Sequence, residues 1–241
     1  FPLPEGLNGI PDLLDEAAWS LKPLLQLQSP EGGMSSKPDM YATPIESIYD
    51  ATFIDTPERE CIVQEAYPPD VTMTFIHAAL MAQAAFLWHK LDALQALIYF
   101  DSAKKAYTWA KENGEMQGGS AAWAALQMTR ASQDISYMDD FAATGYTFRG
   151  VDDDIWDFYA ASAYMKLDPK FVDVSTQQEY RANVVEMARN WYESGMTRAY
   201  PRVHHPYNPT TWGAAAYPIA PQPVFIAHAI ENSLESLEWV Q

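Results

Sequence analysis

Apolar residues recur every three or four positions along most of the chain, which is the period of α-helices that bury one face. The first such segment is followed by a break at Ser29-Pro30 and a Gly-Gly turn. Its apolar stripe consists of Ile10, Leu13, Leu14, Ala17, Leu21, Leu24 and Leu25. Pro11 suits the first helical position, and Asn8 or Gly9 can cap the helix. We therefore expect an amphipathic helix that ends before Ser29.

Further segments have the same helical period. Residues 72–91 are apolar on nearly every side, which predicts a helix buried on several faces. Other helices are expected over residues 92–113, 120–130, 151–167, 224–230 and 234–241. One more ends near Ser194-Gly195, and Ser175 with Gln178 predicts a capping box at its start.

Two stretches, residues 34–70 and 198–213, are rich in Pro and aromatic residues and lack a helical period. Irregular segments of this length usually serve a function. No alternating strand pattern stands out, so the sequence predicts an all-α fold. A solenoid, a bundle and an α/α toroid all fit, although the lack of a fixed-period repeat disfavours the solenoid.

The charge limits the partners that this chain can bind. With 15 Lys and Arg against 32 Asp and Glu, the net charge is −17. Such a chain repels phosphate backbones and anionic lipid surfaces, so neither nucleic acid nor a membrane is expected as a partner. No apolar run approaches the roughly 20 residues that cross a bilayer, so no membrane insertion is expected.

Cysteine and aromatic content change the picture further. The single cysteine, Cys61, can form neither an internal disulfide nor a thiolate metal cluster,. Aromatic residues make up 13% of the chain, with 8 Trp and 14 Tyr. Rings beyond the needs of a core often line clefts that stack on sugars or bases, and the acidity weighs against bases. No G-x-S-x-G elbow and no Gly-rich phosphate loop is present.

Six segments follow one another along the chain: GIPDLLDEAAWSLKPLLQLQSPEGG, YPPDVTMTFIHAALMAQAAFLW, FDSAKKAYTWAKENG, DDDIWDFYAASAYMKLDPKF, NPTTWGAAAY and ENSLESLEWVQ. In this order they resemble the catalytic modules of glycoside hydrolase family 9. The resemblance implies an (α/α)6 barrel, an incomplete toroid in these residues, with residues 1–241 forming part of one catalytic domain. The family's D-A-G-D motif and its catalytic glutamate are expected outside this sequence, so no catalytic residue is assigned within it.

The resemblance also implies sugar-binding residues. Trp212 and Tyr217 match the Trp and Tyr of the family's W-G-x-x-R-Y segment, which flank sugar subsites. A flat ring beside a pyranose buries apolar C–H surface. Packing of Trp212 under its Pro-rich loop is an equally good interpretation. Ala216 stands where the family has Arg, and residues 34–70 lack the His and Trp of the family's D-H-x-x-W element.

A structural calcium ion is a further expectation. Asp152 and Asp153 match an Asp-Glu pair at which some family members hold calcium, and carboxylate oxygens suit that ion. The alternative is that these residues, with Asp154, only complement the dipole at the start of a helix. No cofactor is required for the expected chemistry. His204-His205 lacks a third ligand at a suitable spacing, which disfavours a metal there.

The resemblance implies a secreted, extracellular endoglucanase-like enzyme that hydrolyses β-1,4-linked glucan or a related polysaccharide with inversion. The alternative is a toroid that has lost catalysis and serves as a structural or carbohydrate-binding part of an extracellular assembly. Half a toroid would expose apolar helix faces to water, and large exposed patches of that kind are rare in monomers. We therefore expect further chain segments or subunits to complete the barrel.

Overall fold

The computed structural model describes residues 9–35, 38–40, 64–66, 68–149, 155–196, 226–228 and 230. These residues are almost entirely helical, so the prediction of an all-α fold is confirmed for them, with one short pair of strands in addition. The chain forms two compact units, Phe1–Glu115 (unit 1) and Met116–Gln241 (unit 2). Each unit is described by itself, and a single domain over residues 1–241 stays a prediction.

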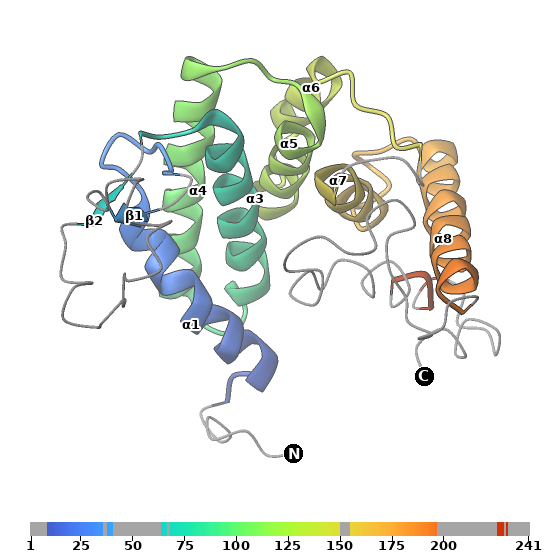
Figure 1. Ribbon diagram of the computed structural model, residues 1–241, viewed down its shortest axis with the longest axis horizontal. Coiled ribbons are helices and arrows are strands. Elements are labelled where there is room, and N and C mark those ends of the chain that lie inside the picture. Colours follow the sequence, from blue (N-terminus) through green and yellow to red (C-terminus); the bar gives the residue numbers. More distant parts are fainter. Residues whose placement is uncertain are drawn as a thin grey trace, which may run out of the picture. The chain divides into compact units, whose positions relative to one another are not determined.

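Unit 1 contains three helices and a short two-stranded sheet (Figure 1). The elements are α1 (Asp12–Leu27), β1 (Pro38–Met40), β2 (Gln64–Ala66), α3 (Val71–Trp88) and α4 (Ala93–Asn113). The two strands pair antiparallel, with Pro38 opposite Ala66. They lie inside the 34–70 segment that the sequence predicted to be irregular, and at three residues each they are too short to show an alternating pattern.

Helices α3 and α4 form an antiparallel hairpin whose starts are fixed by aspartate caps. The Asp70 carboxylate accepts from the backbone N–H of Met73 at 2.8 Å. The Asp92 carboxylate accepts from Gln95 N–H at 3.0 Å. Both bonds satisfy N–H groups that have no partner within the helix. The predicted helices 72–91 and 92–113 are confirmed, with small shifts at the turn.

Helix α3 is apolar all round because it is buried by its neighbours. Its buried residues include Phe75, Met81 and Trp88. By length and composition α3 is also long enough to cross a membrane, which corrects the expectation that no segment comes near that limit. Since 61% of the helix is buried inside the structure, its role as a core helix explains the same apolar composition,.

Unit 2 contains four labelled helices (Figure 1). They are α5 (Gly118–Ser132), α6 (Ser136–Ala143), α7 (Ile155–Met165) and α8 (Val174–Met196). The sequence did not predict α6, whose eight residues give too few turns for a clear period. Phe141 of α6 packs on Tyr146 and Tyr164, with ring centroids 6.0 and 5.5 Å away.

The start of α8 corrects one prediction. Asp173, not Ser175, caps this helix, because its carboxylate accepts from the backbone N–H of Thr176 at 2.8 Å and from the Ser175 hydroxyl. These two hydrogen bonds lower the pKa of Asp173,. The pattern misled because Asp173, Ser175 and Thr176 lie within four residues and all three residue types can cap a helix,.

The C-terminal part of α8 packs on a later segment of the chain. Val185 and Ala188 form a buried cluster with Ala227, and Tyr192 and Ile230 pack against it. Residues 226–228 and 230 are helical, in agreement with the helix predicted over residues 224–230. The helix predicted over residues 234–241 lies outside the described residues.

Candidate functional site

The side chains that the resemblance nominates for function lie outside the described residues. They are Trp212 and Tyr217 for sugar, Asp152 and Asp153 for calcium, and the His204-His205 pair. Their roles stay predictions. Within the described ranges, no group of three His, Cys, Asp or Glu side chains is placed to hold a metal ion. The site is therefore built from the segments that lead into those residues.

The turn that follows α1 is held by a dense set of hydrogen bonds. Ser29 N–H donates to Gly33 O at 2.8 Å, and the Ser29 hydroxyl accepts from Gly33 N–H at 3.1 Å. Met34 N–H then donates to the buried Thr74 hydroxyl of α3 at 2.9 Å. This hydrogen bond to α3 therefore fixes the position of Met34, the first residue of the 34–70 segment.

Two glycines make this turn possible. Gly32 has a φ of +114°, and a Cβ there would collide with the backbone carbonyl of Lys105 in α4. A Cβ at Gly33 would lie 2.6 Å from Pro69 Cβ and 2.8 Å from Trp109 Cε2. Only glycine allows this backbone to lie so close to α4, which explains the Gly-Gly pair that the sequence showed.

A buried polar network ties the turn to both helices of the hairpin. Gln28 donates through Nε2 to Gly32 O at 3.1 Å and to Ser102 O at 3.0 Å. The Ser102 hydroxyl donates to Gln28 Oε1 at 2.7 Å. Since that hydroxyl has one proton, it must accept from His77 Nε2, which lies 2.9 Å away,. His77 therefore carries its proton on Nε2.

Burial sets the charge of His77. Its side chain is 2% exposed, and desolvation lowers its pKa to about 4,. The ring is neutral at pH 7, which suits a network that offers no nearby carboxylate in the described residues. Nδ1 has no hydrogen-bond partner within the part of the chain that the structure describes. The network therefore works as a structural tie, and it fixes the turn through Gln28.

In unit 2 an aromatic cluster lies at the start of α7. Trp123 of α5 stacks on Trp156 with centroids 6.0 Å apart and on Tyr159 with centroids 4.9 Å apart. Trp123 is buried, whereas Trp156 and Tyr159 are half-buried. The cluster follows directly after residues 152–154. Because Trp156 and Tyr159 are partly exposed, they are candidates for contact with a sugar ring,.

Helix α5 approaches α7 closely enough to hold this cluster in place. A Cβ at Gly119 would collide with the backbone and the carboxylate of Asp157. The Tyr146 hydroxyl donates to the backbone carbonyl of Asp157 from the other side. The first turn of α7 is therefore fixed by contacts from two segments. The sequence analysis did not single out Trp156 or Tyr159, and the only signal was the Trp beside the acidic run.

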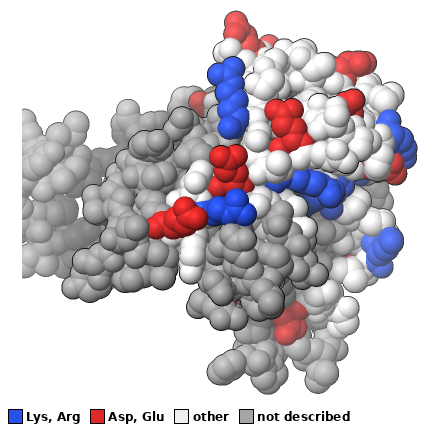
Figure 2. All heavy atoms as spheres, turned by 90° about the vertical axis from the view of Figure 1, so that its right-hand side faces the viewer, with Lys and Arg blue, Asp and Glu red and all other residues white. Residues whose placement is uncertain are grey.

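Charge on the surface of unit 2 is mixed in sign. Figure 2 shows Lys and Arg interspersed with Asp and Glu on the face that carries α8. No single-sign field is visible on the described part of this face. The described part of this face therefore gives no support to a polyanionic partner. The prediction that nucleic acid is not bound still rests on the net charge of −17,.

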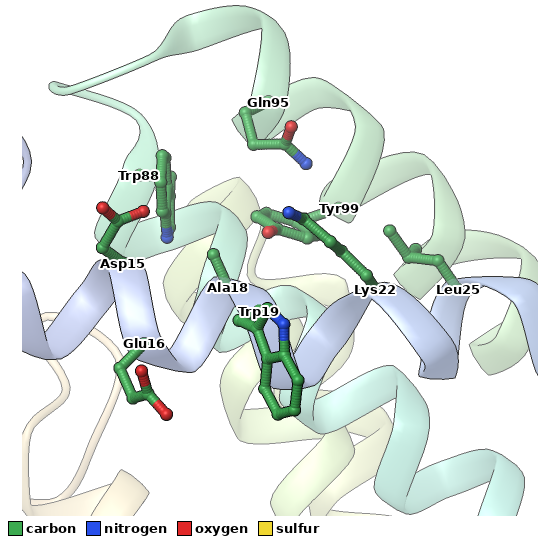
Figure 3. Close-up of a pocket in the computed structure, with 9 residues that line it drawn as sticks. All are labelled: Asp15, Glu16, Ala18, Trp19, Lys22, Leu25, Trp88, Gln95 and Tyr99. Atoms are coloured by element: carbon green, nitrogen blue, oxygen red, sulfur yellow. The ribbon is translucent and has the colours of Figure 1, made fainter. Parts of the chain in front are cut away.

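A pocket of about 480 Å³ lies in unit 1, between α1 and the α3–α4 hairpin (Figure 3). Asp15 and Lys22 project on the same side of α1 as Gln95 and Tyr99, whereas Trp19 projects on the other side. Among the aromatic side chains that line the pocket, Tyr99 is 2% and Trp88 is 5% exposed, whereas Trp19 is 68% exposed. Trp19 is therefore the lining aromatic residue that has open ring surface.

Comparison with known families decides the assignment. The model of the family described as glycosyl hydrolase family 9 matches residues 3–236. The chain belongs to this family. The resemblance seen in the six sequence segments is confirmed, and so is the fold class, because the similar solved structures are family 9 (α/α)6 barrels.

The chain is similar to solved family 9 structures over nearly its whole length. A metagenome-derived family 9 endoglucanase has a TM-score of 0.78 at 21% identity, covering 99% of this chain and 46% of that one. A thermostable endoglucanase from Alicyclobacillus acidocaldarius has a TM-score of 0.72 at 17% identity, with coverage of 97% and 47%. The chain thus spans less than half the length of these structures, and the barrel in it is incomplete.

One curated relative has a name that states its substrate. A xyloglucan-specific endo-β-1,4-glucanase from Bacteroides ovatus is 32% identical over 120 residues, which cover 47% of this chain and 19% of that enzyme. Because the match covers only part of each protein, the xyloglucan-specific activity is stated of the relative alone.

Proposed function

We propose that this chain is part of an inverting, secreted family 9 β-glycanase that hydrolyses β-1,4-linked glucan or a related polysaccharide outside the cell. The observation that carries the proposal is the family match over residues 3–236. The partial match to a xyloglucan-specific relative makes xyloglucan a candidate beside plain glucan. The lack of His and Trp in residues 34–70 fits a preference that differs from plain cellulose.

Inversion sets strict demands on the frame of the enzyme. A carboxylate base activates water on one face of the sugar, and a carboxylic acid protonates the leaving oxygen on the other, with the two groups roughly 6.5 to 9.5 Å apart. Both groups are expected outside these 241 residues. This chain would contribute the predicted sugar contacts at Trp212 and Tyr217, and the partly exposed Trp156 and Tyr159 are further candidates.

A second function is a barrel that binds glycan without cleaving it. Ala216 at the family's Arg position and the missing D-H-x-x-W element favour it, since each removes an expected sugar contact. This alternative keeps the extracellular setting and the polysaccharide partner. It differs from the first only in catalysis.

The test is an assay of the full-length protein on a panel of soluble β-1,4-glucans that includes xyloglucan. Release of reducing ends from at least one glucan supports the enzyme. Retardation of the protein in a glucan-containing gel without any release supports the binding alternative. Neither release nor retardation on any glucan would contradict both.

A structural calcium ion at Asp152 and Asp153 is part of the proposal. If calcium binds the native state, saturating calcium raises the melting temperature, because a ligand that binds only the folded protein stabilises it. Asp152→Asn should abolish that increase. An increase that is unchanged in this variant, or no increase in the parent protein, would remove the site.

A further inference from the structure

The 34–70 segment leaves the helices and returns to them at one place. The backbone N–H of Asp70 donates to Met34 O at 3.0 Å, so the first and last residues of the segment are hydrogen-bonded to each other. Ser35 and Pro69 form the next antiparallel bridge, and strands β1 and β2 pair further along. The segment therefore has a two-stranded root at the start of α3.

One buried hydroxyl, that of Thr74 near the start of α3, holds both ends of this root. It accepts from the backbone N–H of Met34 at 2.9 Å and donates its one proton to Asp70 O at 2.6 Å,. Thr74 is 0% exposed and Met34 is 4% exposed. An unpaired N–H at such a buried position costs free energy, so the Met34 N–H depends on the Thr74 hydroxyl.

Helix α3 itself does not require this hydroxyl. The backbone N–H of Thr74 already donates to Asp70 O at 2.9 Å, and the Asp70 carboxylate caps the helix at Met73 N–H. Thr129 of α5 provides a comparison, because it is also 0% exposed and its hydroxyl donates to Ala125 O within its own helix. The Thr74 hydroxyl differs in that it also contacts a residue 40 positions away.

The length and composition of the 34–70 segment suit contact with a glycan. A connection between helices usually has about 2–8 residues, and much longer ones usually serve a function. This one contains aromatic residues among polar ones, namely Tyr41, Tyr49, Phe53 and Tyr67. Aromatic rings can stack on the apolar faces of sugars. Binding by such a segment is precise only if rigid elements hold it, and the root on α3 provides that support.

We propose that Thr74 is a positioning residue for glycan binding: its hydroxyl fixes the root of the 34–70 segment, and the fixed segment raises the affinity for the polysaccharide. This inference rests on the proposed function, since it takes a glycan as the ligand. Thr74 acts through the segment and not on the reacting atoms. Its loss should therefore raise KM and leave kcat unchanged, as expected when binding alone is weakened.

Three substitutions in the full-length protein test this role. Thr74→Val nearly keeps the volume and removes the hydroxyl, whereas Thr74→Ser keeps the hydroxyl and removes the methyl group. Thr129→Val is the matched control, because it removes a buried hydroxyl that bonds within one helix. Two quantities are compared: hydrogen exchange, by mass spectrometry of peptides that contain Met34, and the kinetics on soluble β-1,4-glucan.

Thr74→Val should speed the exchange of the Met34 N–H about 10-fold, because a buried donor loses its acceptor. It should raise KM about fivefold at unchanged kcat. Thr74→Ser and Thr129→Val should keep the parent values. If the parent protein binds glucan without cleaving it, the dissociation constant takes the place of KM.

Unchanged exchange or an unchanged KM in Thr74→Val would overturn the inference, and so would a fall in kcat alone. Equal effects of Thr74→Ser would overturn it too, because loss of methyl packing would then be the cause. If Thr74→Val does not fold, Ser29→Ala takes its place, since the Ser29 hydroxyl accepts from Gly33 N–H at 3.1 Å just before the same root. A raised KM at unchanged kcat supports the inference in that variant, and an unchanged KM overturns it.

Failure of the proposed function gives a different result. A parent protein that neither cleaves nor binds any glucan would contradict the proposed function, and this inference with it. An active parent protein whose Thr74→Val variant has the same KM would contradict this inference alone.

Discussion

The two units of the chain differ most clearly at their surfaces. Among the described residues, seven exposed large apolar side chains lie in unit 1: Leu13, Trp19, Leu87, Leu91, Leu94, Leu97 and Ile98. Unit 2 has two, Ile135 and Val174. Both units have buried cores with side chains at 0% exposure, so the difference is in the outer faces and not in the packing of the interior.

This difference bears on where the proposed further chain would make its contacts. Solved family 9 structures are more than twice as long as this chain, and an incomplete barrel must leave some helix faces without neighbours. Apolar outer faces gather on unit 1, so unit 1 is where further contacts are expected.

The largest expected effect compares two leucines, one from each unit. Leu126→Ala in the fully buried α5 should reduce the free energy of unfolding by about 2–5 kcal/mol, because it leaves a cavity,. Leu94→Ala should cost more than about 1 kcal/mol in the full-length protein if further contacts cover the Leu94 side chain. Chemical denaturation measures both. A Leu94→Ala loss below about 0.5 kcal/mol, typical of surface positions, would remove the difference in covering between the units.

A second pair of substitutions compares two glycines with positive φ. Gly32→Ala in unit 1 combines left-handed strain with a collision against Lys105 and should cost about 2–5 kcal/mol,. Gly118→Ala in unit 2 has a φ of +77° but open space around its Cβ, so about 1–2 kcal/mol is expected,. Thermal unfolding of both variants checks the order. Equal losses would show that the turn after α1 tolerates a side chain.

The stability of unit 1 should depend on pH because of His77. Its folded pKa of about 4 lies below the ordinary 6.5, so between these values the unfolded chain binds a proton that the folded chain does not. Stability is therefore lost as the pH falls from 6.5 to 4, by at most about 3 kcal/mol. His77→Gln should flatten this part of the stability profile. An unchanged slope in the variant would show that other groups cause the loss.

The smallest effect concerns the helix caps, which should be alike in both units. Asp92→Ala at α4 and Asp173→Ala at α8 should each cost about 1 kcal/mol,. Ser175→Ala should cost clearly less, since Asp173 provides the cap. Circular dichroism during thermal unfolding suffices for all three. A larger loss for Ser175→Ala than for Asp173→Ala would restore the capping box that the sequence suggested.

Helices were predictable where the apolar period was long and the caps were clear. The hairpin of α3 and α4 follows from its apolar pattern, and α4 ends at Asn113, the last residue of the predicted range. Helix α6 was missed because eight residues give no period. The β1–β2 pair was missed because its pairing depends on residues 26 positions apart, such as Asp39 and Glu65, which no local pattern reveals.

The candidate site was less accessible to sequence reasoning. The need for Gly32 and Gly33 was visible as a turn, but the close approach of α4 behind it was not. The tie between Gln28, Ser102 and His77 joins two helices to the turn after α1 over as many as 74 positions, so no spacing within one helix could show it. Trp156 and Tyr159 were not singled out from the sequence, because their contact with Trp123 depends on the packing of α7 against α5.

The central claim is that this chain is part of an inverting family 9 hydrolase, and the anomer of the first product tests it most directly. Proton NMR of a β-1,4-glucan during cleavage by the full-length protein should show the α-anomer of the new reducing end first, followed by slow mutarotation. Initial appearance of the β-anomer would contradict the account, because it would mean retention of configuration.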